Sequence, residues 1–228
     1  MFLIAGALII LALIFGPSLW VKLVMRRYSS ENPEIPGTGG ELAKHLIDRF
    51  SLKDVKVEVT ELGDHYDPIE KKVRLLRENY DSKSLTAIAI AAHEVGHAIQ
   101  DQQGDKRLAT RTKMAPVVDK VARWSVAIIY LSPVIGIITR HPMPFSLLLL
   151  LGLCGFIARM MVHVVTLPIE FDASFSKALP LLREGNYVSQ SNEKAVNRIL
   201  RAAALTYVSA ALADILNLGR WMVILLRR

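Results

Sequence analysis

Two histidines and a glutamate stand within five residues of one another in the segment Ala91–Ala98, which reads AAHEVGHA. His93 and His97 are four residues apart, so in a helix their side chains project from one face and can bind one metal ion. Glu94 lies between them and can act on a water molecule beside that ion. This HExxH pattern predicts hydrolytic chemistry assisted by zinc.

The residues around the motif predict one helix that is long enough to carry both histidines. Leu85–Gln100 consists mostly of good helix formers, and Gly104 is typical of a helix stop. Three candidate N-cap residues precede the run: Asp81, Ser82 and Ser84. A charged Glu94 inside an apolar helix is costly unless something pairs with it, which argues against two merely structural histidines.

A catalytic zinc usually takes three protein ligands and leaves a fourth position for water. No further histidine follows His97 at the spacing of the extended metzincin motif, so the third ligand must come from elsewhere. We predict Glu170, which follows a long apolar segment that would return the chain to the side of the HExxH helix. His163 competes on the same helical face, although Pro168 is expected to break that helix.

The remaining histidines offer weaker candidates. His163 lies within an apolar stretch, which favours packing or hydrogen-bonded support of the ligands over direct zinc binding. His45 and His65 lie outside the HExxH helix, and we expect both to be surface or structural residues.

Membrane insertion is predicted from the clustering of apolar residues, which make up 52% of the 228-residue chain. Phe2–Val21 carries no charge, and about twenty helical residues cross a bilayer core. No positive region precedes this stretch, which argues against a cleaved signal peptide. Lys22, Arg26 and Arg27 follow directly, so the positive-inside rule places Met1 outside and the catalytic side in the cytoplasm.

Two further apolar stretches predict a helical hairpin in the membrane. Trp124–Thr139 and Phe145–Leu167 are separated by Arg140–Pro144, which is typical of a tight turn. The final stretch is apolar but is interrupted by Asp214 and other polar residues. It predicts either a fourth span or a helix at the membrane interface, and the sequence leaves both open.

The pattern between the first two apolar regions predicts a small mixed domain. Glu41–Phe50 has the periodicity of an amphipathic helix. Residues Val55–Val59 alternate like a half-buried strand, and Lys72–Leu76 predicts a second short strand. The expected fold class is therefore a mainly α membrane protein with a zincin-like HExxH helix, a small β-sheet and three to four transmembrane helices.

These patterns divide the chain into five predicted parts. They are an N-terminal membrane anchor at 1–25, a cytoplasmic zincin-like part at 26–113, a transmembrane hairpin at 114–168, a cytoplasmic helical part with the third ligand at 169–201, and a C-terminal apolar helix at 202–228.

The formal net charge of +7 is concentrated beside the apolar stretches. No nucleic-acid-binding motif accompanies these charges, so anionic lipid headgroups are the expected partners and nucleic acid is not. The single cysteine, Cys154, lies inside a predicted span and excludes an intramolecular disulfide, in agreement with a reducing catalytic side. Expected partners are the bilayer and a peptide or membrane-protein substrate, while protein partners in the membrane stay open.

Five segments resemble the YugP-type bacterial membrane zinc metallopeptidases, also called neutral zinc metallopeptidases. They are His65–Pro68, Tyr80–Leu85, Ala91–Gln100, Pro168–Ser174 and Ala204–Val208. The likeness covers nearly the whole chain, and the more distant HtpX-type membrane proteases share its plan. The resemblance implies one zinc per chain bound by His93, His97 and Glu170, with Glu94 as catalytic base.

The resemblance has one departure from the pattern of related peptidases. They often place an aspartate four residues after the glutamate ligand, where it orients a zinc-bound histidine. Here that position is Ser174, while Asp172 lies two residues after the glutamate, so the supporting residue stays open. Tyr207, in the last resembling segment, is a candidate for stabilising the transition state.

The sequence therefore predicts a membrane-anchored zinc endopeptidase. A non-enzymatic zinc-binding membrane scaffold is one alternative, against which the intact Glu94 argues. An intramembrane zinc protease is another, with the HExxH helix itself in the bilayer. The sixteen residues Leu85–Gln100 are short for a span and are flanked by charges, which disfavours it.

Overall fold

The computed structural model describes residues 2–215, with the side chains of residue 12 and of residues 15–215. The chain is mainly helical with one small sheet, which confirms that part of the predicted fold class. It divides into two compact units. The site unit comprises residues 16–109 and 167–206, and the hairpin unit comprises the described parts of 1–15, 110–166 and 207–228. Helix α1 (Phe2–Arg27) contributes to both.

Helix α4 (Leu85–Gln102) carries the HExxH motif through the centre of the site unit, and its residues from Leu85 to Gln100 are all buried. The Ser84 side chain caps its start by accepting a hydrogen bond from the Ala87 N–H at 3.1 Å. Gly104 follows its end at a φ of +69°, a left-handed conformation that glycine adopts without strain. The predicted start and stop of this helix are confirmed.

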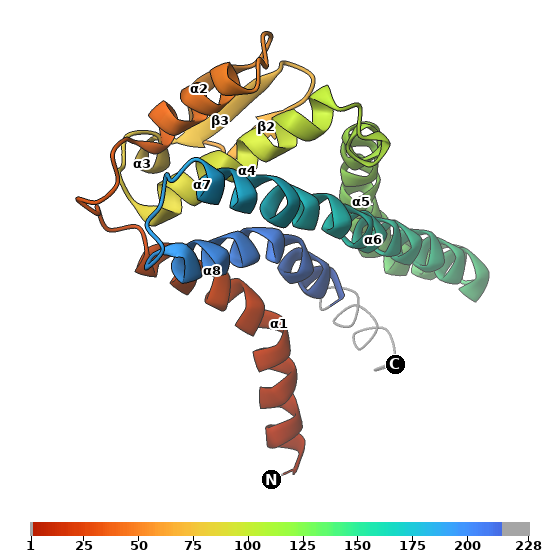
Figure 1. The fold of residues 1–228 in the computed structure, drawn as a ribbon. Helices are drawn as coiled ribbons and strands as arrows, with labels where there is room; N and C mark the ends of the chain where they lie inside the picture. Colours follow the sequence, from red (N-terminus) through yellow and green to blue (C-terminus); the bar gives the residue numbers. More distant parts are fainter. Residues whose placement is uncertain (1, 216–228) are drawn as a thin grey trace. The chain divides into compact units, whose positions relative to one another are not determined.

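Short helices pack around α4 in the site unit (Figure 1). Thr38 and Glu41 form a capping box at the start of α2, whose predicted amphipathic face is confirmed by the burial of Leu42 and Leu46. The elements are α2 (Gly39–Arg49), α3 (Arg77–Tyr80), the π-helix η1 (Asp172–Ala178), α7 (Leu179–Glu184) and α8 (Glu193–Ala204).

The sheet has three strands in the order β1-β3-β2: β1 (Lys56–Thr60), β2 (His65–Asp67) and β3 (Lys72–Leu76). The central strand β3 pairs parallel with β1 and antiparallel with β2. Val73 and Leu75 of β3 are fully buried in the core that includes α4. Two of these strands were predicted, while β2 is too short to show an alternating pattern.

Tyr66 of β2 connects the sheet to the end of the HExxH helix. Its hydroxyl donates a hydrogen bond to Asp101 Oδ2 at 2.6 Å, and Lys71 contacts the same oxygen at 2.5 Å. Burial, together with the neighbouring carboxylate, raises the pKa of Tyr66 well above its usual range. The resembling segment His65–Pro68 therefore holds α4 against the sheet.

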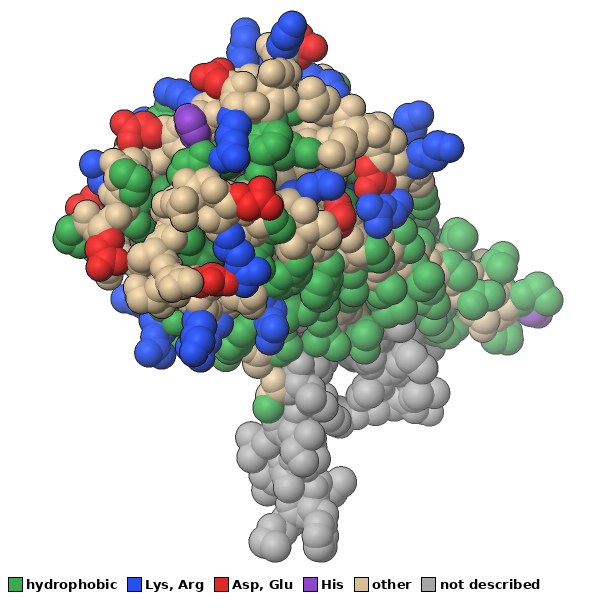
Figure 2. All heavy atoms as spheres, in the orientation of Figure 1, with side chains coloured by type: hydrophobic (Ala, Val, Ile, Leu, Met, Phe, Trp, Pro, Cys, Tyr) green, Lys and Arg blue, Asp and Glu red, His purple; other side chains and the backbone are tan. Residues whose placement is uncertain are grey.

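The hairpin unit is built on α5 (Lys106–Thr139) and α6 (Pro142–Phe171). Within the described residues, α5 and the continuous helical stretch Pro142–Glu184 are long and apolar enough to cross a membrane. Figure 2 shows hydrophobic side chains gathered over the hairpin helices. Large apolar residues of α5 and α6 such as Trp124, Ile138 and Leu147 are exposed. Two apolar helices with outward apolar side chains are typical of a membrane protein.

Two details of the hairpin differ from prediction. The turn is shorter than Arg140–Pro144, because Pro142 is the first residue of α6, a position where proline is favoured since it needs no N–H donor there. Pro168 does not break α6, which continues to Phe171. Helices in a membrane-protein bundle tolerate proline when neighbouring groups satisfy the freed carbonyl.

Close packing of small residues holds the hairpin together. A Cβ at Gly155 would lie 1.8 Å from Ser125 Oγ, and one at Gly152 would lie 2.4 Å from Ile129 Cγ1. The two helices therefore approach to a distance that only glycine permits, as is common in membrane helix pairs.

Of the predicted C-terminal segment 202–228, residues 202–206 lie in the site unit, where 202–204 end α8, and residues 207–215 lie in the hairpin unit. Residues 206–215 are helical, and the rest of the predicted segment 202–228, from residue 216 onward, lies outside the described residues. The buried Asp214 lies 3.3 Å from His163 Nε2 and 3.4 Å from Arg159 Nε. Whether this segment crosses the membrane stays a prediction.

Candidate metal centre

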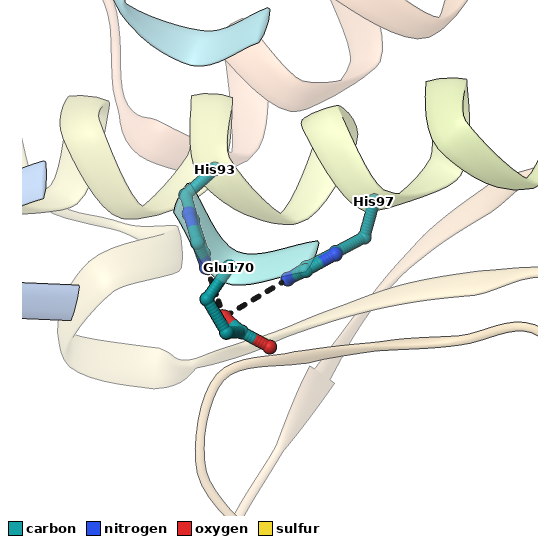
Figure 3. Close-up of side chains that lie close together, drawn as sticks. All are labelled: His93, His97 and Glu170. Atoms are coloured by element: carbon teal, nitrogen blue, oxygen red, sulfur yellow. Dashed lines mark hydrogen bonds and ion pairs between the residues drawn. The ribbon is translucent and has the colours of Figure 1, made fainter. Parts of the chain in front are cut away.

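Helix α4 and the end of α6 bring together the three predicted ligands. Glu170 Oε2 lies 3.2 Å from His93 Nε2 and 3.3 Å from His97 Nε2 (Figure 3). One potential ligand atom from each residue lies within 4.8 Å of the other two, and all three residues are buried. Ligand bonds of about 2.0 Å in a tetrahedral site place neighbouring ligand atoms about 3.3 Å apart. The separations fit one small cation.

The outer nitrogen of His93 is held by Ser174. Ser174 Oγ lies 3.0 Å from His93 Nδ1 and donates its own hydrogen to the Leu200 carbonyl of α8 at 3.2 Å. Because that hydrogen is committed, the hydroxyl accepts the Nδ1–H of His93. The lone pair of the neutral imidazole is then on Nε2, which faces Glu170.

His97 is held in the same way by a different side chain. Its Nδ1 lies 2.9 Å from Gln100 Oε1, which can only accept a hydrogen bond. Its Nε2 therefore also presents a lone pair towards the glutamate. Each ligand histidine thus has its hydrogen on the outer nitrogen.

This arrangement requires positive charge at the centre. Two neutral imidazoles and a carboxylate would place three lone-pair-bearing atoms against one another in a space from which water is excluded. Such a contact is unfavourable unless a proton or a metal cation lies between the atoms. Imidazole and carboxylate are ligands that zinc accepts, so the residues present fit the metal that the motif predicts.

The backbone after Glu170 lets this residue approach α4 closely. A π-helix, η1, begins two residues later, and such segments are frequent at functional sites. It packs directly on α4 at Gly96, where a Cβ would lie only 2.9 Å from the Ala173 carbonyl oxygen. The glycine within HEVGH therefore permits the contact that places Glu170 and Ser174 beside the histidines.

Ser174 and Asp172, the two candidates for supporting a ligand histidine, contact different residues in the structure. Ser174 contacts His93 directly, while Asp172 accepts a hydrogen bond from Gln100 Nε2 at 2.7 Å and reaches His97 only through that residue. Each candidate therefore lies behind a different histidine. Gln100 was missed in the sequence, although its spacing of three residues from His97 places it on a neighbouring helical position.

The other candidates lie elsewhere. His163 and Tyr207 belong to the hairpin unit, where His163 lies beside Asp214 and the Tyr207 hydroxyl accepts a hydrogen bond from Arg111. His45 contacts the Tyr187 hydroxyl at 2.7 Å, and His65 contacts the Gly63 carbonyl at 2.7 Å. Among the described residues, the triad of His93, His97 and Glu170 is the one group of three that could hold a metal.

Glu94 is buried, with 7% of its surface exposed, one position after the first histidine of the motif. Such a buried carboxylate is a candidate for acid–base chemistry at this centre.

The fold and the site define a class of protein: a mainly helical chain in which an HExxH helix and a distant glutamate form a candidate metal centre. The chain belongs to the family described as "Putative neutral zinc metallopeptidase", whose sequence profile matches residues 2–226. It is 36% identical over 217 residues to the "Putative membrane protease YugP" of Bacillus subtilis strain 168, which covers 92% of both chains. No solved structure matches the chain.

Proposed function

We propose that this protein is a multi-pass membrane zinc endopeptidase with its catalytic side in the cytoplasm. The observation that carries the proposal is the buried convergence of His93, His97 and Glu170 beside Glu94. Family membership and the likeness to a membrane protease support it. When bound, zinc would polarise the scissile carbonyl and make water a stronger nucleophile at neutral pH.

Glu94 is the general base in this proposal. Its carboxylate takes a proton from the attacking water and then delivers a proton to the leaving amine, so that the peptide bond is hydrolysed without a covalent enzyme intermediate. Ser174 and Gln100 keep the two imidazoles in one tautomer throughout. Tyr207 is retained as a candidate donor to the oxyanion on the resemblance of its segment alone.

A groove along the first two turns of α4 offers a path for the substrate. It has a volume of about 610 Å³ and is lined by Thr86 and Ile90 of α4 and by residues of α1 that include Lys22. Thr86, Ile90 and His93 lie on one face of α4, since their spacings of four and three residues return to the same side of a helix. We propose that an extended peptide lies along this face.

The predicted topology limits the substrate to segments close to the cytoplasmic membrane surface. The basic residues Lys22, Arg26 and Arg27 at the end of α1 would lie among headgroups, and Lys22 and Arg26 also line the groove. Three to four spans are proposed, from α1, α5, α6 and the C-terminal segment. A membrane protein cleaved just outside its own span is the proposed substrate class.

Metal analysis of the purified full-length protein tests the proposal. We expect about one zinc per chain in the wild type and a large loss in Glu170→Ala, whereas His45→Ala and His65→Ala serve as matched controls and retain the metal. Zinc loss should be accompanied by loss of cleavage of a generic peptide library. Full zinc occupancy in Glu170→Ala would contradict the ligand assignment, and zinc binding without any cleavage would favour a scaffold.

A further inference from the structure

We propose that Gln100 is a positioning residue that fixes the tautomer of His97 and links it to the backbone beside Glu170. The inference rests on the proposed zinc site and extends it to a residue outside the HExxH motif. Gln100 is a polar residue with only 1% of its surface exposed, on the last full turn of α4. A buried amide must satisfy both of its ends, so its contacts determine its orientation.

The orientation of the Gln100 amide is determined by three contacts. Its Nε2 lies 2.9 Å from the Ile169 carbonyl oxygen and 2.7 Å from Asp172 Oδ2, and both of these atoms are acceptors. Rotating the amide by 180° would place Oε1 against the same two acceptors and lose both hydrogen bonds. The Oε1 atom must therefore face His97 Nδ1 at 2.9 Å.

This orientation sets the chemistry of His97. Because Oε1 has no hydrogen to give, it selects the tautomer with hydrogen on Nδ1 and a lone pair on Nε2, the atom that lies 3.3 Å from Glu170. Hydrogen bonding at the outer nitrogen of a ligand histidine orients the ring and increases its basicity. Gln100 therefore supplies the acceptor that holds the outer nitrogen of His97.

The same side chain joins two ligand-bearing segments. Ile169, whose carbonyl accepts from Gln100, directly precedes Glu170, so one amide holds the His97 ring and the backbone of the third ligand at once. Asp172 completes the contact and is itself within 4.0 Å of Arg107. Loss of the amide should displace both ligands, whereas loss of Ser174 should affect His93 alone.

Five variants of the full-length protein, including Asp172→Asn alone, test this role, with zinc affinity measured by competition with a chromophoric chelator. Gln100→Leu keeps the volume and removes the polar contacts. Gln100→Glu keeps an acceptor for His97 but places a second carboxylate against Asp172. The double variant Gln100→Glu/Asp172→Asn restores a donor opposite the new carboxylate. Gln102→Leu, two positions along the same helix at an exposed site, is the matched control.

We expect Gln100→Leu and Gln100→Glu each to weaken zinc binding by about 10- to 100-fold. The double variant should recover most of that loss, while Asp172→Asn alone should change little because an asparagine oxygen can still accept from Gln100. A purely structural role would not produce this reciprocal rescue. The visible spectrum of bound Co²⁺ should shift in Gln100→Leu and return in the double variant.

The outcomes separate this inference from the proposed function. A wild type that binds no zinc would contradict the proposed function itself. A wild type that binds zinc, with Gln100→Leu equal to Gln102→Leu, would overturn the role of Gln100. If Gln100→Leu does not fold, the comparison of Gln100→Glu with the double variant decides, and equal zinc affinity of these two would overturn the inference.

Discussion

Gly96→Ala is expected to weaken zinc binding by changing the distance between α4 and η1. The added Cβ would lie 2.9 Å from the Ala173 carbonyl oxygen and 3.3 Å from Lys177 Cβ. Ordinary contacts begin at 3.4 Å, so η1 would have to move by about 0.5 Å (3.4 − 2.9). Both contacts are on η1, so we expect the segment to move as a whole.

That movement would change the contacts that orient the candidate ligands. Ser174 Oγ lies 3.0 Å from His93 Nδ1, and a shift of about 0.5 Å would bring this hydrogen bond to the limit of its range. Overpacking in a well-packed core costs about 1–3 kcal/mol, while alanine is favoured over glycine in a helix by about 1 kcal/mol, which leaves a net cost of about 0–2 kcal/mol. At about 1.4 kcal/mol per tenfold change, the zinc affinity should fall by up to about 30-fold.

Chelator competition and thermal unfolding of the detergent-solubilised protein measure this effect. Gly16→Ala is the control, because a Cβ at Gly16 meets no atom within 4 Å and the same change of residue type should leave zinc binding intact. Wild-type zinc affinity together with a wild-type Tm in Gly96→Ala would refute the view that close packing of η1 on α4 sets the ligand geometry.

Further predictions concern the groove, the hairpin and the topology. Ile90→Trp should fill part of the groove and lower peptide cleavage at least about tenfold while zinc content stays unchanged; unchanged cleavage would exclude the groove as the substrate path. Asp214→Ala should lower the Tm by leaving Arg159 without its buried partner, whereas an exposed Asp81→Ala should not. A cysteine placed at His141 should react with an impermeant reagent outside the cell, and one placed at Asp105 should not; the reverse would invert the topology.

The HExxH helix and the candidate role of Glu170 could be predicted because local signals point to them. Ser84, the helix-forming run and Gly104 mark the ends of α4, and the spacing of His93 and His97 places both on one face. Glu170 was identified because a carboxylate beside a long apolar stretch needs a partner, and the structure places it against both histidines.

The parts that could not be predicted depend on contacts between distant segments. Strand β2 has three residues and forms only because β3 offers it a partner. Pro168 has a local preference for ending a helix, but α6 continues through it. The role of Gln100 depends on Ile169 and Asp172, which are about seventy positions away in the sequence and become its neighbours only in the folded chain.

The central claim is that Glu94 is the catalytic base beside a zinc ion held by three other residues. Glu94→Gln tests it most directly, with zinc content and peptide cleavage measured on the same preparation. Glutamine keeps the shape of the side chain but cannot take a proton, so we predict full zinc occupancy and a loss of cleavage at or beyond about 10⁴-fold, the upper end for a general base. A variant that binds zinc and cleaves at the wild-type rate would contradict the account.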